Sequence, residues 1–188
     1  MDSLSNITIY TDRLVLKSIT IDDCSDQYVS WLNDTEVNKY LEFSFKKQDM
    51  NDLISFIKTA VQKLDVLFLS IRLKVNNEHI GNIKIDKISL HHLTGEYGIM
   101  MGDKNEWGNG YAKEASIAII DFCFNTLKLQ KINLGVINGN KSAIKLYESL
   151  GFVTEGVLRK NFYEKASNSW DDEIRMGLIN TESKFYNQ

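Results

Sequence analysis

The sequence predicts a single α+β domain built around a mixed, mostly antiparallel sheet. The chain has 188 residues, 43% of them hydrophobic, which suffices for one well-buried domain but is short for two. Segments with alternating apolar residues and segments with apolar residues at helical spacing succeed one another, with no linker, repeat or low-complexity stretch between them. The sequence has no proline, so Gly, Asn and Asp must mark the ends of its elements.

The first third of the chain predicts one strand followed by helices. Arg13–Ile19 alternates and is typical of a strand. Thr20 is expected to begin a helix that ends near Leu32, with Asp23 as its partner in a capping box. Two more helices are expected, a short one over 33–41 and an amphipathic one over Lys47–Lys63.

The middle of the chain predicts a meander and then a crossover. Three strand candidates, Val66–Val75, His79–Ile88 and Gly95–Met101, are joined by short polar turns. A buried helix over Ala115–Leu127 and a strand over Lys131–Ile137 follow. A strand, loop, helix and strand in this order require a right-handed crossover, so the last strand is expected to be parallel to its neighbour.

The last fifty residues predict a helix and a hairpin. Asn140 caps a helix whose apolar residues fall at i, i+3, i+4 and i+7, and Gly151 is expected to end it. Phe152–Tyr163 and Trp170–Ile179 then close the chain as two strands of a hairpin.

Composition narrows the class of function. With 22 Lys and Arg against 25 Asp and Glu, the net charge is −3, which disfavours nucleic acid as a partner. Cys24 and Cys123 lie far apart and are typical of reduced thiols in a cytoplasmic protein. No apolar run approaches ~18 residues, so neither export nor a membrane span is expected. His79, His91 and His92 have no metal-ligand spacing, so no metal is expected.

The stretch "NEWGNGYAKEA", residues 105–115, places Gly108 and Gly110 just before a helix. A dinucleotide fingerprint would need a third small residue where Lys113 stands, and no P-loop pattern occurs. Two interpretations remain open. The glycines serve either a plain strand-to-helix turn or a bare backbone whose N–H groups receive an anion at the helix N-terminus.

Four motifs in order resemble the GNAT superfamily of acyl-CoA-dependent N-acyltransferases, in its Rim-type, spermidine and amino-sugar acetyltransferase branch. They are "TDRLVLKSI", "HIGNIKI", "EYGIMMGDKNEWGNGYAKEA" and "NKSAIKLYESLGFVTEGVLR". The resemblance spans about Thr11 to Ile179. It implies a GNAT-like sheet with a splayed parallel strand pair and flanking helices. The domain is expected over residues 11–180, with 1–10 and 181–188 as terminal extensions.

The resemblance implies acetyl-CoA as co-substrate and assigns residues to it. The coenzyme would lie where Glu96–Met101 splays from Lys131–Ile137. The pantetheine arm would bond the main chain of Ile99, Met100 and Met101, and the pyrophosphate would rest on the N–H groups of Trp107, Gly108, Asn109, Gly110, Tyr111 and Ala112. Asn140 matches a family asparagine that helps to hold CoA, whereas Asn105 takes the place of the family's Gln or Arg and is shorter.

The implied reaction is attack by an amine nitrogen on a thioester carbonyl. Tyr147 matches the family's tyrosine, which protonates the departing thiolate. A weak acid suffices for this step, because the thiolate of a thiol with pKa ~8.5 leaves readily. Periodicity alone also fits Tyr147 as a core residue. Glu96 is the best candidate for taking the amine proton, directly or through water, although a structural carboxylate is an equal alternative. The run of acids at 171–173 is interpreted as solvated.

The acceptor amine is expected to contact the segment after the first helix. Trp31 and Tyr40 can stack on a sugar or base, and Asn33 and Asn38 can bind hydroxyls; packing or capping explains all four equally well. The segment looks most like amino-sugar acetyltransferases, so a nucleotide-linked amino sugar is the first expectation. Spermidine and ribosomal-protein N-termini are rivals, and a non-catalytic CoA-binding module is the alternative from another class. The late hairpins of this fold often pair between subunits, so a homodimer is one expectation.

Overall fold

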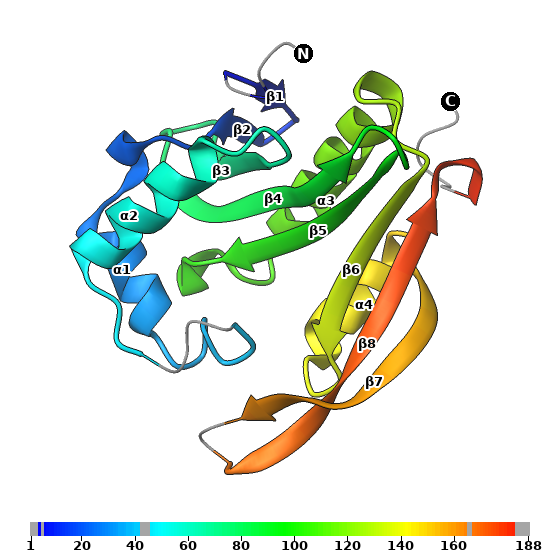
Figure 1. The fold of residues 1–188 in the computed structure, drawn as a ribbon. Coiled ribbons are helices and arrows are strands. Elements are labelled where there is room, and N and C mark those ends of the chain that lie inside the picture. The colour runs from blue at the N-terminus through cyan, green and yellow to red at the C-terminus, as the bar shows by residue number, and fades with distance from the viewer. Residues whose placement is uncertain (1–3, 5, 42–45, 165–166, 183–188) are drawn as a thin grey trace.

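The computed structural model describes residues 4, 6–41, 46–164 and 167–182. These residues form an eight-stranded sheet in the order β1-β2-β3-β4-β5-β6-β8-β7 (Figure 1). The strands are β1 Thr8–Tyr10, β2 Leu14–Ser18, β3 Leu67–Leu73, β4 His79–Ser89, β5 Thr94–Met101, β6 Lys131–Ile137, β7 Val153–Glu164 and β8 Ser169–Ile179. Neighbouring strands are antiparallel except β5 and β6. The predicted mixed, mostly antiparallel sheet is therefore confirmed.

Helices cover both faces of the sheet. α1 (Asp26–Asn33) and α2 (Met50–Val61) lie on one face, and α3 (Tyr111–Asp121) and α4 (Lys141–Ser149) pack on the other (Figure 1). Each face has its own apolar cluster. The larger one joins the sheet to α3 and α4, and the smaller one gathers around α1 and α2. In the described part of the chain no helix has the length and hydropathy needed to cross a membrane.

The parallel pair separates after three residues. Thr94 pairs with Lys131, Gly95 with Ile132 and Glu96 with Asn133. Beyond these pairs, β5 continues to Met101 against β4, and β6 continues to Ile137 against β8. The sheet therefore opens at the carboxyl ends of its parallel strands, which is where ligands bind in open α/β sheets.

The helix predicted over Lys47–Lys63 is confirmed as the slightly shorter α2. Three other helix predictions differ more from the structure, and two of them concern the residues on either side of α1. Thr20 and Asp23 do form a capping box, but it caps a single 3-10 turn. The helix breaks because Cys24 is extended (ψ 116°), and Ser25 then caps α1. The short helix expected over 33–41 is a series of turns in residues 34–41. There the Asn38 side chain donates to the Leu32 carbonyl, at 2.8 Å.

The third difference concerns α3, which begins at Tyr111, four residues before the predicted start. It ends at Asp121 in a π-helical turn, Phe122–Thr126, rather than continuing regularly. Strand β1, in the stretch expected to be a terminal extension, pairs with β2. The predicted caps of α4 are confirmed, because the Asn140 side chain accepts from Ala143 N–H and Gly151 has φ +95°.

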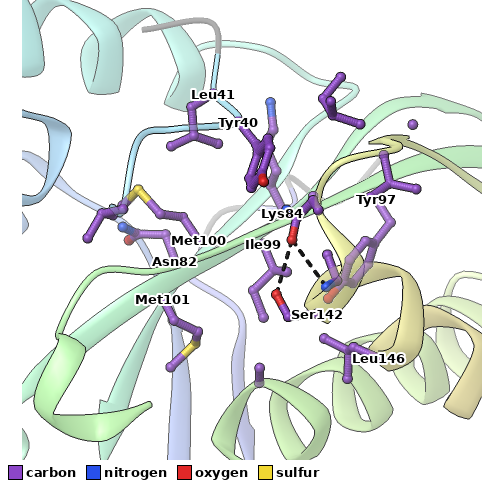
Figure 2. A pocket seen from close by; sticks show the side chains of 18 of the residues that line it. Tyr40, Leu41, Asn82, Lys84, Tyr97, Ile99, Met100, Met101, Ser142 and Leu146 are labelled. Atoms are coloured by element: carbon purple, nitrogen blue, oxygen red, sulfur yellow. Dashed lines mark hydrogen bonds between the residues drawn. The ribbon is translucent and has the colours of Figure 1, made fainter. Parts of the chain in front are cut away.

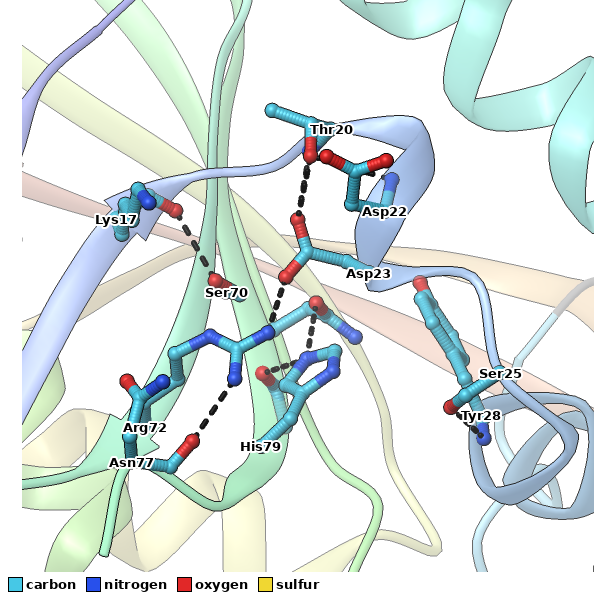
Figure 3. A network of polar contacts seen from close by, with 12 residues as sticks. Lys17, Thr20, Asp22, Asp23, Ser25, Tyr28, Ser70, Arg72, Asn77 and His79 are labelled. Carbon is cyan, nitrogen blue, oxygen red and sulfur yellow. Dashed lines mark hydrogen bonds and ion pairs between the residues drawn. The ribbon is translucent and has the colours of Figure 1, made fainter.

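A largely buried polar network ties the first turn to the sheet (Figure 3). Asp23 forms an ion pair with Arg72 of β3 and accepts from the Thr20 N–H. His79 lies beside them, with Nε2 at 3.0 Å from Asn82 Oδ1, and its burial keeps the pKa of the imidazole below its usual value. Removing one partner of a buried ion pair costs about 3–5 kcal/mol. This network therefore fixes where α1 begins.

Candidate active site

One cavity of about 1080 Å³ passes through the opening in the sheet and reaches both faces. On the α3 side it is lined by α4 and by residues of the segment 107–112, which we call the glycine loop. On the α1 side it is lined by Tyr40, Leu41, α2 and the charged residues of β4, β5 and β8. Figure 2 shows Ile99 and Met101 of β5 and Ser142 and Leu146 of α4 around it. Two molecules can therefore reach the same point from opposite faces.

The glycine loop presents unpaired backbone donors to the cavity. Gly108 and Gly110 both have φ +81°, and Gly110 is the N-cap of α3 without a side-chain cap. No hydrogen bond joins the N–H groups of residues 108–112 to any other described residue. Such groups at a helix start carry partial positive charge and suit an anion. The Trp107 N–H differs from the prediction, because it already donates to the Lys104 carbonyl.

The free edge of β5 offers main-chain groups to an extended ligand. Gly102 N–H donates to Ile80 of β4. Because backbone direction alternates along a strand, Ile99 and Met101 face the opening, whereas Met100 faces β4. The Trp107 indole N–H donates to the Met101 carbonyl at 3.0 Å. Of the three residues predicted to bond the pantetheine arm, Ile99 thus offers both of its groups and Met101 its N–H.

The three asparagines assigned to coenzyme lie differently. Asn140 lines the cavity while it caps α4, so its two predicted roles are compatible in position. Asn105 and Asn109 do not line the cavity. Asn105 N–H donates to Asp103, and the Asn109 side chain donates to Glu106. Asn109 can contribute its backbone, and the side chain of Asn105 has no place in this site.

Tyr147 lies on α4 with its ring in the aromatic wall of the cavity. Its ring centroid is 5.7 Å from that of Tyr97 and 6.0 Å from that of Phe152. The Tyr97 hydroxyl is hydrogen-bonded to Ser116 and not to Tyr147. No hydrogen bond joins the Tyr147 hydroxyl to another described side chain, and burial raises the pKa of Tyr147 to about 12. A protonated hydroxyl thus remains available to a ligand.

Glu96 is the last residue of β5 that pairs with β6, at the point where these two strands part. Its Oε2 is 2.6 Å from Lys87 Nζ, and its Oε1 is 3.0 Å from Arg175 Nη2. Burial alone would raise the pKa of Glu96, but hydrogen bonds from Lys87 and Arg175 outweigh burial and hold this pKa below its usual value. Glu96 is therefore anionic at neutral pH.

The acids of the last hairpin are not a solvated run, so that prediction is wrong. Asp171 accepts from the Gly139 N–H at 2.8 Å, and Asp172 accepts from the Lys160 N–H at 2.8 Å. Glu173 pairs with Arg175 and lines the cavity. Side chains alternate between the two faces of the sheet along β8, so Glu173 and Arg175 lie on one face, where Arg175 contacts Glu96. The sequence does contain a signal for this arrangement, because Glu173 and Arg175 are two residues apart in a predicted strand and therefore lie on the same face.

Comparisons with known proteins identify the family of this chain. Residues 13–153 match the family model "Acetyltransferase (GNAT) domain". Over 177 residues, 93% of this chain and 97% of the relative, the chain is 33% identical to the Bacillus licheniformis "Uncharacterized N-acetyltransferase p20". The chain belongs to the GNAT acetyltransferase family. It is therefore an acetyl-CoA-dependent N-acetyltransferase, and acetyl-CoA is its acyl donor.

Two further comparisons are with spermidine acetyltransferases. A Vibrio cholerae spermidine N(1)-acetyltransferase is 32% identical over 109 residues, covering 58% of this chain and 60% of that protein. A crystal structure of Vibrio cholerae spermidine N-acetyltransferase with CoA and spermine has the same fold. Its TM-score is 0.82 at 23% identity, covering 92% of this chain and 98% of that one.

Of the four residues predicted to contact the acceptor, only Tyr40 lines the cavity of this GNAT domain. Tyr40 lines the cavity, and its hydroxyl donates across it to the Gly139 carbonyl at 3.0 Å. Trp31 is buried against Gly102 and His79. The amides of the other two bond nearby backbone: Asn33 to Val29 and Gln48, and Asn38 to Leu32. Trp31, Asn33 and Asn38 therefore have structural roles outside the cavity lining.

Proposed function

We propose that the chain transfers an acetyl group directly from acetyl-CoA to a primary amine, with both substrates bound at once. The donor enters on the α3 side, with its diphosphate on the free amides of the glycine loop. The acceptor enters on the α1 side, between Tyr40 and Glu96. The observation that carries this proposal is the single cavity that joins those amides, the Tyr147 hydroxyl and the charged acceptor wall.

Tyr147 donates the proton that the departing thiolate needs. Its hydroxyl stays protonated at neutral and mildly alkaline pH because burial raises its pKa. A thiol of pKa ~8.5 is a good leaving group, so a phenol with a high pKa is acid enough. The buried ring contacts with Tyr97 and Phe152 keep the hydroxyl in one place.

Glu96 attracts the acceptor as an ammonium ion and receives its proton, directly or through water. A carboxylate whose pKa is held low by Lys87 and Arg175 does not keep a proton at neutral pH. It therefore passes the proton on to solvent and leaves the amine neutral for attack.

Glu96→Gln is expected to lower kcat/KM for the amine about 10-fold or more at pH 7, and less as the pH rises. At high pH the free amine already predominates, so the carboxylate is needed less. Steady-state rates over a pH series at fixed acetyl-CoA measure this. An equal loss at every pH would leave Glu96 a structural role only.

The acceptor we favour is a hydroxyl-bearing amine, with nucleotide-linked amino sugars first. Three carboxylates of the acceptor wall already have cationic partners: Asp86 with Lys84, and Glu96 and Glu173 with Arg175. A monoamine needs only Glu96 for its one ammonium group, whereas a polycation would have to displace the partners of several of these carboxylates at once. Asn82 also lines the cavity, and its buried Nδ2 has no hydrogen-bond partner among the described residues. A sugar oxygen can accept from this amide, whereas a protonated polyamine cannot.

Spermidine is the second candidate, because a relative 32% identical over 109 residues is a spermidine N(1)-acetyltransferase. Thiol release from acetyl-CoA with nucleotide amino sugars, spermidine and N-terminal peptides separates the candidates. Higher kcat/KM for an amino sugar supports our proposal, and higher kcat/KM for spermidine or a peptide overturns it. CoA binding without turnover of any amine would indicate a non-catalytic CoA-binding module.

A further inference from the structure

We propose that Arg13 is a positioning residue for the donor, because it sets the direction of the Gly110 N–H in the glycine loop. The proposal rests on the proposed function, in which that loop receives the diphosphate of acetyl-CoA. It adds a residue from the other end of the chain, just before β2, which the family motif of the loop does not include.

The Arg13 side chain reaches the loop and the first turn of α3 together. Its Nη1 donates to the Asn109 carbonyl at 3.1 Å. Its Nε and Nη2 both lie 2.7 Å from Glu114 Oε2. The guanidinium carbon lies 4.5 Å from the centroid of the Tyr111 ring. The planar fork of arginine suits such a set of contacts, whereas a lysine ammonium cannot reach both acceptors in the same way.

Arg13 and the first turn of α3 fix two successive peptide planes, one each. All described peptide bonds are trans, so the C=O and N–H of each plane point in opposite directions. Arg13 holds the Asn109 carbonyl, which turns the Gly110 N–H away from the guanidinium. The Glu114 N–H holds the Gly110 carbonyl at 3.1 Å, which turns the Tyr111 N–H out of the helix end. Glycine at φ +81° would otherwise allow the loop several orientations.

Arg13 also neutralises the negative charge of Glu114, which would otherwise repel the diphosphate of the donor. The Glu114 carboxylate stands in the first turn of α3, where it would repel a diphosphate. It accepts hydrogen bonds from Thr11 Oγ1 at 2.6 Å and from the Arg13 N–H at 2.8 Å, besides its ion pair with the guanidinium. The Arg13 side chain is half exposed, so the pair contributes little to stability. Variants at Arg13 should therefore fold.

Arg13→Met and Arg13→Lys test the proposal, with S-acetylpantetheine as a donor that lacks the diphosphate. The readout is the ratio of kcat/KM for acetyl-CoA to kcat/KM for S-acetylpantetheine, with one good amine held constant. We expect both variants to lower this ratio about 10-fold or more, mainly through KM for acetyl-CoA. Lys74→Met is the matched control, because its ammonium lies in the same region and donates to the Thr11 carbonyl rather than to the Asn109 carbonyl of the loop.

Different results would overturn the positioning role of Arg13 and the diphosphate site itself. An Arg13→Lys variant with the wild-type ratio means that charge alone matters, and it overturns the positioning role. Equal losses with both donors, or a loss in Lys74→Met as large as that in Arg13→Met, overturn it as well. If the wild-type enzyme itself uses both donors equally well, the diphosphate site fails and the Arg13 proposal fails with it.

Discussion

Tyr147→Phe is expected to lower kcat about 10²-fold, with little change in CoA affinity. The substitution removes one hydroxyl and keeps the ring that packs against Tyr97 and Phe152. General acid catalysis typically contributes about 10²–10⁴-fold, and a thiolate leaves readily enough to place the effect at the lower end. The rate of thiol release at saturating acetyl-CoA and amine gives kcat, and calorimetry gives the CoA dissociation constant.

Tyr97→Phe is the matched control, because it removes a neighbouring buried hydroxyl whose partner is Ser116. It should leave kcat within a few-fold of wild type. A Tyr147→Phe enzyme with unchanged kcat would remove Tyr147 from the chemistry. The pH profile gives a second check. Because the folded-state pKa of Tyr147 is about 12, kcat should not fall through loss of this proton until the pH approaches that value.

Gly110→Val is expected to raise the CoA dissociation constant about 10-fold or more, because a β-branched residue at positive φ costs roughly 1–3 kcal/mol. Gly110 has φ +81° and caps α3 without a side chain. Valine would relax to negative φ, rotate the free N–H groups away from the diphosphate and place methyl groups in its approach. Calorimetric titration with CoA measures the change.

Gly156→Val is the control for this substitution. Gly156 has no heavy atom within 4 Å of its would-be Cβ and no positive φ, and it lies in β7, away from the glycine loop. Its CoA affinity should equal that of wild type. Wild-type affinity in Gly110→Val would contradict the assignment of the loop, whereas weak binding in both variants would point to a general effect of folding.

The local sequence pattern predicts the parts of the site that come from a single continuous segment of the chain. The spacing of Gly108 and Gly110 before a helix predicts a bare helix N-terminus, and the structure has one. Asn140 and Tyr147 are seven residues apart on one helix, so helical periodicity brings both to the same side, and both line the cavity. Strand alternation likewise predicts the meander β3–β5 nearly to the residue.

Contacts between distant segments are not encoded in local pattern. Glu96 has its partners 9 and 79 residues away, at Lys87 and Arg175, and only the register of β6 and β8 brings Arg175 to it. Trp31 illustrates a different limit. An aromatic residue on an apolar helix face fits a ligand wall or a core equally, and here Gly102 leaves the space that the indole fills. The break at Cys24 also follows from tertiary structure, because Asp23 is held by Arg72 of β3.

The central claim is that the free amides of the glycine loop bind the diphosphate of CoA. Calorimetric titration of the wild-type protein with CoA and, separately, with pantetheine tests it most directly. We expect CoA to bind at least about 100-fold more tightly than pantetheine, a difference of roughly 2.7 kcal/mol. Equal affinities, or no heat with CoA at protein and ligand concentrations that saturate other acetyltransferases, would contradict the claim.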